Sequence, residues 1–329
     1  MTKRTRWLAG SATVALLLSL LVYFLYLEFP AEPDLPGNYA REAMDWDRQT
    51  RSYGVYIPQR RVDAPALVLV FHGSGGSAAQ SRAMYAYAFE QLAEQHGFIV
   101  LYPEGYEDHY NGCRKAGPYA ANRLQIDDVG FMRALVARFV KREGVNPRAV
   151  FATGVSNGGQ MALRLALEAP DLVAAVAPVA TSLPTPDNMD CKASGRPVAF
   201  MLMNGTADPM NPYHGGEVAL YGLLGNRGGV LSSPQTVEYF AQLAGYREEP
   251  VRSVLPDLAP DDGSQVEVTL WRAPGRVPVA LYTVHGGGHS APHPQVRLPR
   301  LLGGSNRDIV AAAEMWGFFQ SAVESPTRQ

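Results

Sequence analysis

The sequence predicts an α/β fold built on a mostly parallel, doubly wound sheet. Short, continuous apolar runs recur along the chain, and such runs are typical of strands covered on both faces. Segments with helical periodicity stand between several of these runs, which indicates helices on both sides of a parallel sheet. The chain has 329 residues, 47% of them hydrophobic, which is enough for one large domain with a full core.

The expected elements follow one another from residue 53 onward. We expect strands at Tyr53–Ile57, Ala66–Phe71, Phe98–Tyr102, Ala149–Thr153, Val173–Ala180, Val198–Met203 and Val279–Val284. Helices are expected over Ser77–Gln95, Asp127–Arg142 and Gly158–Glu168, and from a Ser305-x-x-Asp308 pattern that resembles a capping box through Val323. Residues 214–232 and 253–265 are predicted to be irregular connections. Residues 30–50, rich in proline and charge, should be a linker to a catalytic domain over 51–323, with 324–329 as a tail.

The first 29 residues differ in composition from the rest. Lys3, Arg4 and Arg6 precede an apolar run over 7–29 in which Glu28 is the only charge. This length fits one membrane span of about 20 residues, and the basic flank should stay in the cytoplasm. No small-x-small cleavage site follows. We therefore expect an uncleaved signal anchor that holds the next domain in the cell envelope, on the non-cytoplasmic side of the membrane. The alternatives are a cleaved signal peptide with secretion, and a buried helix of the globular domain.

The charge balance argues against nucleic acid as a partner. Lys and Arg number 29 against 31 Asp and Glu, for a formal net charge of −2, and the sequence has no basic stripe. No group of His, Cys and carboxylate residues has the spacing of metal ligands. Neither a metal nor an organic cofactor is expected.

Cys113 and Cys191 are the only cysteines. Each lies in a segment that follows a predicted strand, so both segments leave the carboxyl edge of the sheet and can meet there. A cysteine pair in an exported domain is expected to be oxidised. The sequence therefore predicts one disulfide at the rim of the site, with two unrelated buried thiols as the alternative.

The sequence Gly154-Val155-Ser156-Asn157-Gly158 joins a predicted strand to a predicted helix. A turn this tight leaves no room for side chains at the flanking positions, hence the glycines. It exposes the serine at the carboxyl edge of the sheet, at a helix N-terminus that favours negative charge. This context predicts Ser156 as a nucleophile, with an ordinary glycine-rich turn as the alternative.

A serine nucleophile needs a base, and the base needs an orienting acid. In a fold with this turn, the acid and then the histidine follow the serine along the chain. Asp208 comes just after a buried strand, and His289 comes after the last strand and three glycines. We predict these two as acid and base. His285 is the rival base, and a turn-forming role is the alternative for Asp208.

The oxyanion hole requires two backbone N–H groups aimed at the developing charge. One should come from Asn157, the residue after the nucleophile. The other should come from the HGSGG loop that follows the first buried strand. We choose Ser74 as that donor, with Gly73 and Gly75 as alternatives. His72 is expected to brace this loop rather than to act as a base.

Taken together, the motifs resemble the polyhydroxybutyrate depolymerase and feruloyl esterase family of α/β-hydrolases over roughly residues 50–320. The matching pieces are FHGSGGS (71–77), YPEG (102–105), DDVGF (127–131), GVSNGG (154–159), NGTADPMNPYHGG (204–216), GGGH (286–289) and WGFF (316–319). The resemblance implies Ser156, Asp208 and His289 as a triad that hydrolyses carboxylic esters without a metal or organic cofactor. It also implies that Asp128 stabilises the fold. Family members often carry Trp-Pro soon after the last histidine; this chain reads Ser290-Ala291-Pro292, so the pocket wall there should differ.

Three functions remain in competition. They are a serine esterase, a peptidase or amidase with the same triad, and a membrane-tethered binding protein that retains the fold without catalysis. The resemblance and the intact set of triad residues favour the esterase, acting through an acyl-enzyme. About ten residues follow Phe319, which leaves no room for a module that binds solid polyester. The expected partners are therefore small or oligomeric esters: short-chain, hydroxyalkanoate-oligomer or aromatic.

Overall fold

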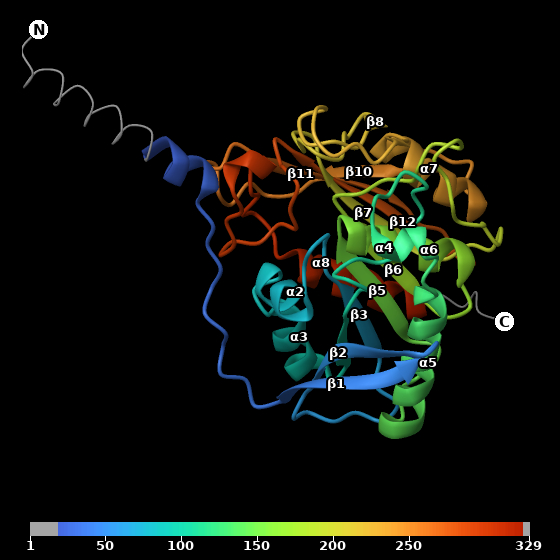
Figure 1. Cartoon of the computed structure of the whole chain (residues 1–329). Coiled ribbons are helices and arrows are strands. Elements are labelled where there is room, and N and C mark those ends of the chain that lie inside the picture. The colour runs from blue at the N-terminus through green and yellow to red at the C-terminus, as the bar shows by residue number, and fades with distance from the viewer. Residues whose placement is uncertain (1–18, 325–329) are drawn as a thin grey trace, which may run out of the picture.

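The computed structural model describes residues 19–324, and its centre is a ten-stranded sheet (Figure 1). The strands lie in the order β1-β2-β4-β3-β5-β6-β7-β12-β11-β10. Their bounds are β1 (Asn38–Trp46), β2 (Gln49–Ile57), β3 (Leu67–Phe71), β4 (Ile99–Pro103), β5 (Val150–Val155), β6 (Ala175–Val179), β7 (Ala199–Gly205), β10 (Val251–Val254), β11 (Gln265–Trp271) and β12 (Val279–His285). From β4 to β12 the six neighbouring strands are parallel, while the outer strands pair antiparallel. The predicted mostly parallel α/β fold is confirmed.

Helices cover both faces of this sheet. They are α2 (Ala78–Met84), α3 (Ala88–His96), α4 (Ala120–Arg123), α5 (Asp128–Glu143), α6 (Asn157–Glu168), α7 (Ser233–Leu243) and α8 (Ala311–Glu324). The helices α5, α6 and α7 share one buried cluster with the sheet, and α2, α3 and α8 share the other. A small hairpin of β8 (Gly216–Glu217) and β9 (Gly229–Val230) and a short 3₁₀ turn at Arg300–Leu302 lie in the loops.

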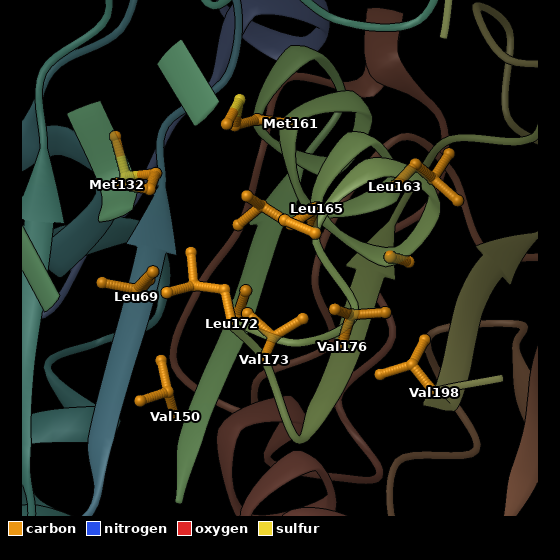
Figure 2. Close-up of a cluster of buried hydrophobic side chains, with 14 of the residues drawn as sticks. Leu69, Met132, Val150, Met161, Leu163, Leu165, Leu172, Val173, Val176 and Val198 are labelled. Carbon is orange, nitrogen blue, oxygen red and sulfur yellow. The ribbon is translucent and has the colours of Figure 1, made fainter. Parts of the chain in front are cut away.

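The core on the α5–α6 face supports the turn at Ser156. Leu69 and Val176 project from the sheet, and Met132, Met161 and Leu165 come from the two helices (Figure 2). All five side chains are fully buried. Because each contributes about 1.5–3 kcal/mol by leaving water, this face anchors α6 firmly against β5.

Several expected boundaries differ from the structure. Strand β1 occupies residues 38–46 of the predicted linker; it is a half-exposed, charged edge strand, so no continuous apolar run marks it. The predicted helix over 77–95 is two helices, separated where Ala86 and Tyr87 take positive φ values of 50° and 59°. The final helix begins at Ala311 rather than Ser305.

The capping box predicted for the final helix is wrong. The Ser305 hydroxyl accepts a hydrogen bond from Leu298 N instead (3.1 Å). Asp308 accepts from Leu258 N and Ala259 N, at 2.9 and 3.0 Å, and so ties down a distant loop. A helix-start pattern in sequence can serve any loop that has free N–H groups.

Three elements lie where irregular chain or nothing was predicted. The helix α7 begins at a capping box formed by Ser232 and Gln235, a signal that was present in the sequence. Strand β10 is fully exposed, which removes its apolar signal. Strand β11 alternates between buried and half-exposed residues, as expected near a sheet edge.

Residues 1–18, which hold much of the predicted membrane segment, lie outside the described part of the chain. Residues 19–25 are helical. The chain then docks on the domain, where Glu28 N donates to Arg297 O (2.8 Å) and Arg300 donates to Tyr23 O (3.1 Å). From residue 19 to residue 324, no helix is both long and apolar enough to cross a membrane.

Candidate active site

The strand β5 and the helix α6 meet at a strained turn centred on Ser156. Its backbone has φ 58° and ψ −113°, a region that L residues rarely adopt and that costs about 1–3 kcal/mol. A Cβ on Gly154 would lie 2.6 Å from the Gly158 carbonyl carbon, and a Cβ on Gly158 would overlap the Phe71 carbonyl. The predicted reason for the two glycines is confirmed. Ser156 N donates to Val179 O (2.9 Å), which ties the turn to β6, and the serine is half-buried.

Asp208 and His289 come together after β7 and β12. His289 Nδ1 lies 2.7 Å from Asp208 Oδ2, and the two side chains are 8% and 1% exposed. Asp208 Oδ1 also accepts hydrogen bonds from Met210 N and Asn211 N, at 2.8 and 2.9 Å. A carboxylate on Nδ1 holds the proton there and leaves the Nε2 lone pair as the basic atom.

The glycines before His289 allow close backbone contact. Ala207 N donates to Gly287 O (2.9 Å), Gly288 N to Gly304 O (2.7 Å) and His289 N to Leu302 O (2.6 Å). A Cβ on Gly288 would lie 2.5 Å from Gly303 Cα. The loop over residues 286–289 therefore packs between the end of β7 and residues 302–304, and these contacts fix the position of the His289 imidazole.

Strand order places the three residues at one edge. Strands β5, β6, β7 and β12 are successive neighbours, and their carboxyl ends lie on the same side. Ser156 follows the first, Asp208 the third and His289 the fourth. The structure thus brings Asp208 and His289 into contact and places Ser156 at the same edge.

The HGSGG loop lies beside Ser156. A Cβ on Gly73 would lie 3.9 Å from the Ser156 Cβ. Gly75 N is occupied by Asp108 O (3.0 Å), which removes it as a candidate oxyanion donor. In the described chain Ser74 N donates to no other group, and Asn157 N begins α6, where N–H groups have no partner within the helix. Ser74 and Asn157 remain the predicted donors.

His72 braces this loop as predicted. Its Nδ1 donates to Gly73 O (2.7 Å), and its Nε2 accepts from Gly105 N (2.9 Å). Burial lowers the pKa of His72 to about 4, so the ring is neutral near pH 7.

Sequence reasoning missed the role of the Asn157 side chain. Its Oδ1 accepts from Tyr110 N (2.8 Å), and its Nδ2 donates to Tyr110 O (3.1 Å). This reciprocal pair attaches the segment after β4 to the nucleophile turn. An asparagine between serine and glycine carries no signal of such a distant partner.

No family model matches the chain. The protein NocK of Nocardia uniformis subsp. tsuyamanensis, named provisionally as an esterase, is 32% identical over 284 residues, which cover 83% of this chain and 80% of that protein. The chain belongs to the feruloyl esterase-like family of α/β-hydrolases. The predicted family and the prediction of a carboxylic ester hydrolase are thereby confirmed.

Other relatives of this esterase are matched over shorter stretches. Feruloyl esterase B of Piromyces equi is 27% identical over 69% of this chain and 40% of its own length. An acetylxylan esterase of Coprinopsis cinerea is 29% identical over 44% of this chain and 38% of its own length. The chain thus spans less than half the length of these two relatives. Among solved structures, an acetyl xylan esterase from Aspergillus awamori aligns over 81% of this chain and 95% of its own, with 17% identity and a TM-score of 0.49.

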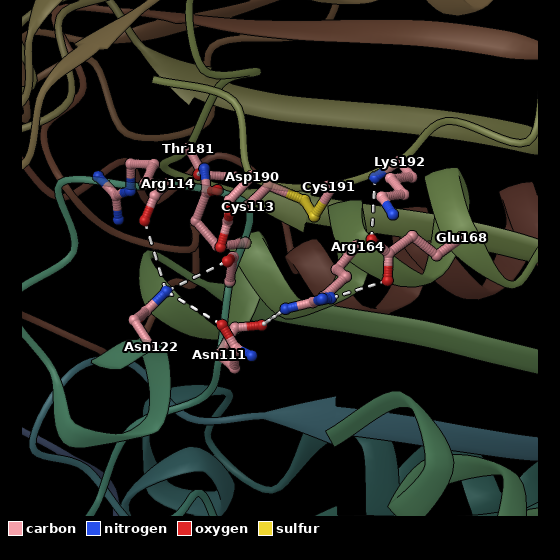
Figure 3. The surroundings of a disulfide bond; sticks show 12 residues. Asn111, Cys113, Arg114, Asn122, Arg164, Glu168, Thr181, Asp190, Cys191 and Lys192 are labelled. Carbon is pink, nitrogen blue, oxygen red and sulfur yellow. Dashed lines mark hydrogen bonds and ion pairs between the residues drawn. A yellow bond between two sulfur atoms is a disulfide. The ribbon is translucent and has the colours of Figure 1, made fainter. Parts of the chain in front are cut away.

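The esterase contains the predicted disulfide. Cys113 and Cys191 are bonded, with their Cα atoms 4.9 Å apart (Figure 3). Asp190 N donates to Cys113 O (2.8 Å), so backbone contact extends the cross-link. The bridge joins the segment held by Asn157 to the segment after β6.

Asp128 is buried in an ion pair with Arg51 (2.6 Å) and accepts from Asn111 N (2.7 Å). Burial raises its pKa, and the guanidinium opposes that shift. These contacts join β2, α5 and the segment after β4, and they agree with the fold-stabilising role that the resemblance implies.

The rival base, His285, lies elsewhere. Its Nε2 is 3.1 Å from Glu267 Oε2, and the side chains are 52% and 28% exposed. Both line a cavity of about 540 Å³ between α7 and the β10–β12 strands, together with Tyr213, Trp271 and Arg252. The structure does not place this pair beside Ser156.

Proposed function

We propose that Ser156, Asp208 and His289 form a catalytic triad that hydrolyses carboxylic esters through an acyl-enzyme. The observation that carries the proposal is the buried contact between His289 Nδ1 and Asp208 Oδ2, at the edge where Ser156 holds a positive φ. Strain of this kind is retained where it presents a reactive group.

In this mechanism Ser156 Oγ attacks the ester carbonyl carbon while His289 Nε2 takes the hydroxyl proton. The Asp208 carboxylate stabilises the imidazolium. The N–H groups of Asn157 and Ser74 bind the oxyanion. The C–O bond to the alcohol then breaks, and the alcohol leaves with the proton from His289. Water repeats the sequence on the acyl-enzyme, releasing the acid and free Ser156.

The substrates we propose are soluble short-chain, hydroxyalkanoate-oligomer or aromatic esters. The names of the feruloyl and acetylxylan esterase relatives support esters of modest size. We further propose that the first 29 residues anchor the esterase in the cell envelope, or direct its secretion if they are cleaved. The basic flank, the apolar run and the disulfide support export. Membrane fractionation and N-terminal sequencing of the mature protein test this; a cytoplasmic, unprocessed protein would contradict it.

The triad is tested with a Ser156→Ala variant. Ester hydrolysis should fall by several orders of magnitude because the triad acts as a unit. A fluorophosphonate probe should label the natural protein and not the variant, whose melting temperature should change little. Labelling that persists in the variant would refute the assignment.

A further inference from the structure

Arg114 is a buried cation without a counter-charge. The residue is only 5% exposed. In the part of the chain that the structure describes, its guanidinium has neither a hydrogen-bond nor an ion-pair partner. Asn122 Nδ2 donates to the Arg114 carbonyl oxygen and not to its guanidinium, and the Arg114 side chain points away from the disulfide (Figure 3). The Arg114 nitrogen atoms are not among the fully buried side-chain atoms that lack a hydrogen-bond partner, so they keep contact with solvent and an incoming anion can reach them.

A second guanidinium lies near the first. Arg227 Nε donates to the Tyr119 hydroxyl (2.6 Å), and its NH1 group donates to Gly225 O (2.6 Å). Neither contact supplies a negative charge. Burial lowers the pKa of Arg114 to about 10, and the like charge of Arg227 acts in the same direction. Arg114 therefore remains charged near pH 7, and no carboxylate of the described residues pairs with it.

Tyr119 connects the two arginines to the HGSGG loop, which holds a predicted donor of the oxyanion hole. Its hydroxyl lies 2.8 Å from Ser74 Oγ, and its ring stacks on His109 with centroids 4.0 Å apart. A second connection runs from Arg114 along the chain to Tyr110, whose backbone N–H donates a hydrogen bond to the Asn157 side chain. Arg114 lies four positions after Tyr110, so the two Cα atoms are at most about 14 Å apart. Because Arg227 Nε and Ser74 Oγ contact the same Tyr119 hydroxyl, at 2.6 and 2.8 Å, the Arg227 guanidinium lies beside the HGSGG loop.

We propose that Arg114 and Arg227 bind a carboxylate carried by the ester substrate, so that this esterase prefers anionic esters. The inference rests on the proposed function and names its substrate class. Guanidinium groups bind a carboxylate through paired N–H donors, and such charge-assisted bonds are strong where water is scarce. Suitable esters are hemiesters of dicarboxylic acids, hydroxy-acid oligomers with a free carboxyl end, and esters of hydroxybenzoic acids.

The test uses two matched substrate pairs. Mono-p-nitrophenyl adipate carries the charge on the acyl side, and its methyl ester is the neutral control. 4-Acetoxybenzoate carries the charge on the alcohol side, and its methyl ester is the neutral control. The natural protein should show at least tenfold higher kcat/KM for the anionic member of one pair. Arg114→Met should remove that preference while changing neutral-ester hydrolysis less than twofold, and Arg114→Lys should restore part of it.

Two further variants keep the outcome decisive. Arg123→Met removes an exposed arginine of the same segment and should leave both substrate pairs unaffected. If Arg114→Met does not fold, Arg227→Gln, at a half-buried position, should still lower the anionic preference severalfold. Equal loss on anionic and neutral esters, or no preference in the natural protein, would overturn the inference alone. Absence of all ester hydrolysis and of fluorophosphonate labelling would overturn the proposed function instead.

Discussion

Two histidines four residues apart in the chain, His285 and His289, each contact a carboxylate, and the two pairs differ in almost every physical respect. His289 and Asp208 are 2.7 Å apart and buried, and the contact uses Nδ1. His285 and Glu267 are 3.1 Å apart, with His285 exposed and Glu267 half-buried, and the contact uses Nε2. Only the first arrangement leaves Nε2 as the basic atom. Only the first also holds its carboxylate with two backbone N–H groups, on Met210 and Asn211.

Neither a short contact nor a nearby cavity is what distinguishes the proposed catalytic pair. His285 and Glu267 line the cavity of about 540 Å³. An ion pair open to solvent contributes only about 0–1 kcal/mol, which is too little to hold an imidazole in one orientation. Burial fixes the tautomer of His289 and keeps the nearby charge on Asp208 unscreened. These differences predict unequal effects of matched substitutions.

The largest expected effect separates the two histidines. His289→Ala should reduce ester hydrolysis about as much as Ser156→Ala, because serine and base act as one unit. His285→Ala should retain activity within a fewfold. Steady-state kinetics on a p-nitrophenyl ester decides between them, and the reverse order would reassign the base to His285.

Substitutions of the two carboxylates should also differ in their effect on activity, by somewhat less than those of the two histidines. Asp208→Asn should lower kcat by up to about 10⁴-fold, since an amide cannot hold the Nδ1–H tautomer or stabilise the imidazolium. Glu267→Gln, the matched change in the more accessible pair, should stay within twofold. If Asp208→Asn kept near-normal kcat, the 2.7 Å contact would be structural only.

The same contrast between buried and exposed explains what the sequence could predict. The six parallel strands are continuous apolar runs, and all six were expected from residues such as Leu67–Phe71. The edge strands β1 and β10 were missed because half or fully exposed strands carry little apolar signal. The turn at Ser156 was predictable because its flanking positions have no room for a side chain and therefore require glycine.

Contacts between distant segments were not predictable. The sequence marks Asn157 only as a turn residue, whereas its side chain holds Tyr110 of another loop. Ser305 and Asp308 match a capping pattern but bind N–H groups of other segments. Arg114 has no motif around it, and its burial became visible only once residues far apart in the chain were brought together.

A third prediction concerns the disulfide, which we expect to stabilise the edge of the sheet that carries Ser156, Asp208 and His289 without taking part in the reaction. The disulfide closes a loop of 78 positions, and such closure contributes up to about 4 kcal/mol through the unfolded chain. A Cys113→Ser, Cys191→Ser double variant should therefore melt at a lower temperature while hydrolysing esters nearly normally at 25 °C. Glu267→Gln, at a half-buried position away from the disulfide, serves as the control, with an unchanged melting temperature. Loss of activity in a fully folded double variant would show that the bridge positions reacting groups.

The smallest effect concerns a buried histidine without a hydrogen-bonded carboxylate. The nearest carboxylate oxygen to His72 Nε2, on Glu104, is 3.7 Å away, too far for a hydrogen bond. Burial lowers the folded-state pKa of His72 to about 4, whereas the unfolded chain titrates near the usual value of about 6.5. Between these values the unfolded state binds the extra proton. The stabilisation is therefore fully present above about pH 6.5 and is lost as the pH falls toward 4, by up to about 1.4 kcal/mol per pH unit.

Replacing His72 should flatten this acid dependence. In His72→Gln the free energy of unfolding should be lower at pH 7.5, because the bonds to Gly73 and Gly105 are weakened, but should fall less steeply between pH 6.5 and 4.5. His285→Gln is the matched control at a position where the side chain is 52% exposed, and the flattening of the slope should be confined to His72→Gln. Urea unfolding at four pH values across this range measures the slopes. Parallel curves for the natural protein and His72→Gln would mean that His72 accepts a proton in the folded state, and the neutral brace on the HGSGG loop would then be wrong.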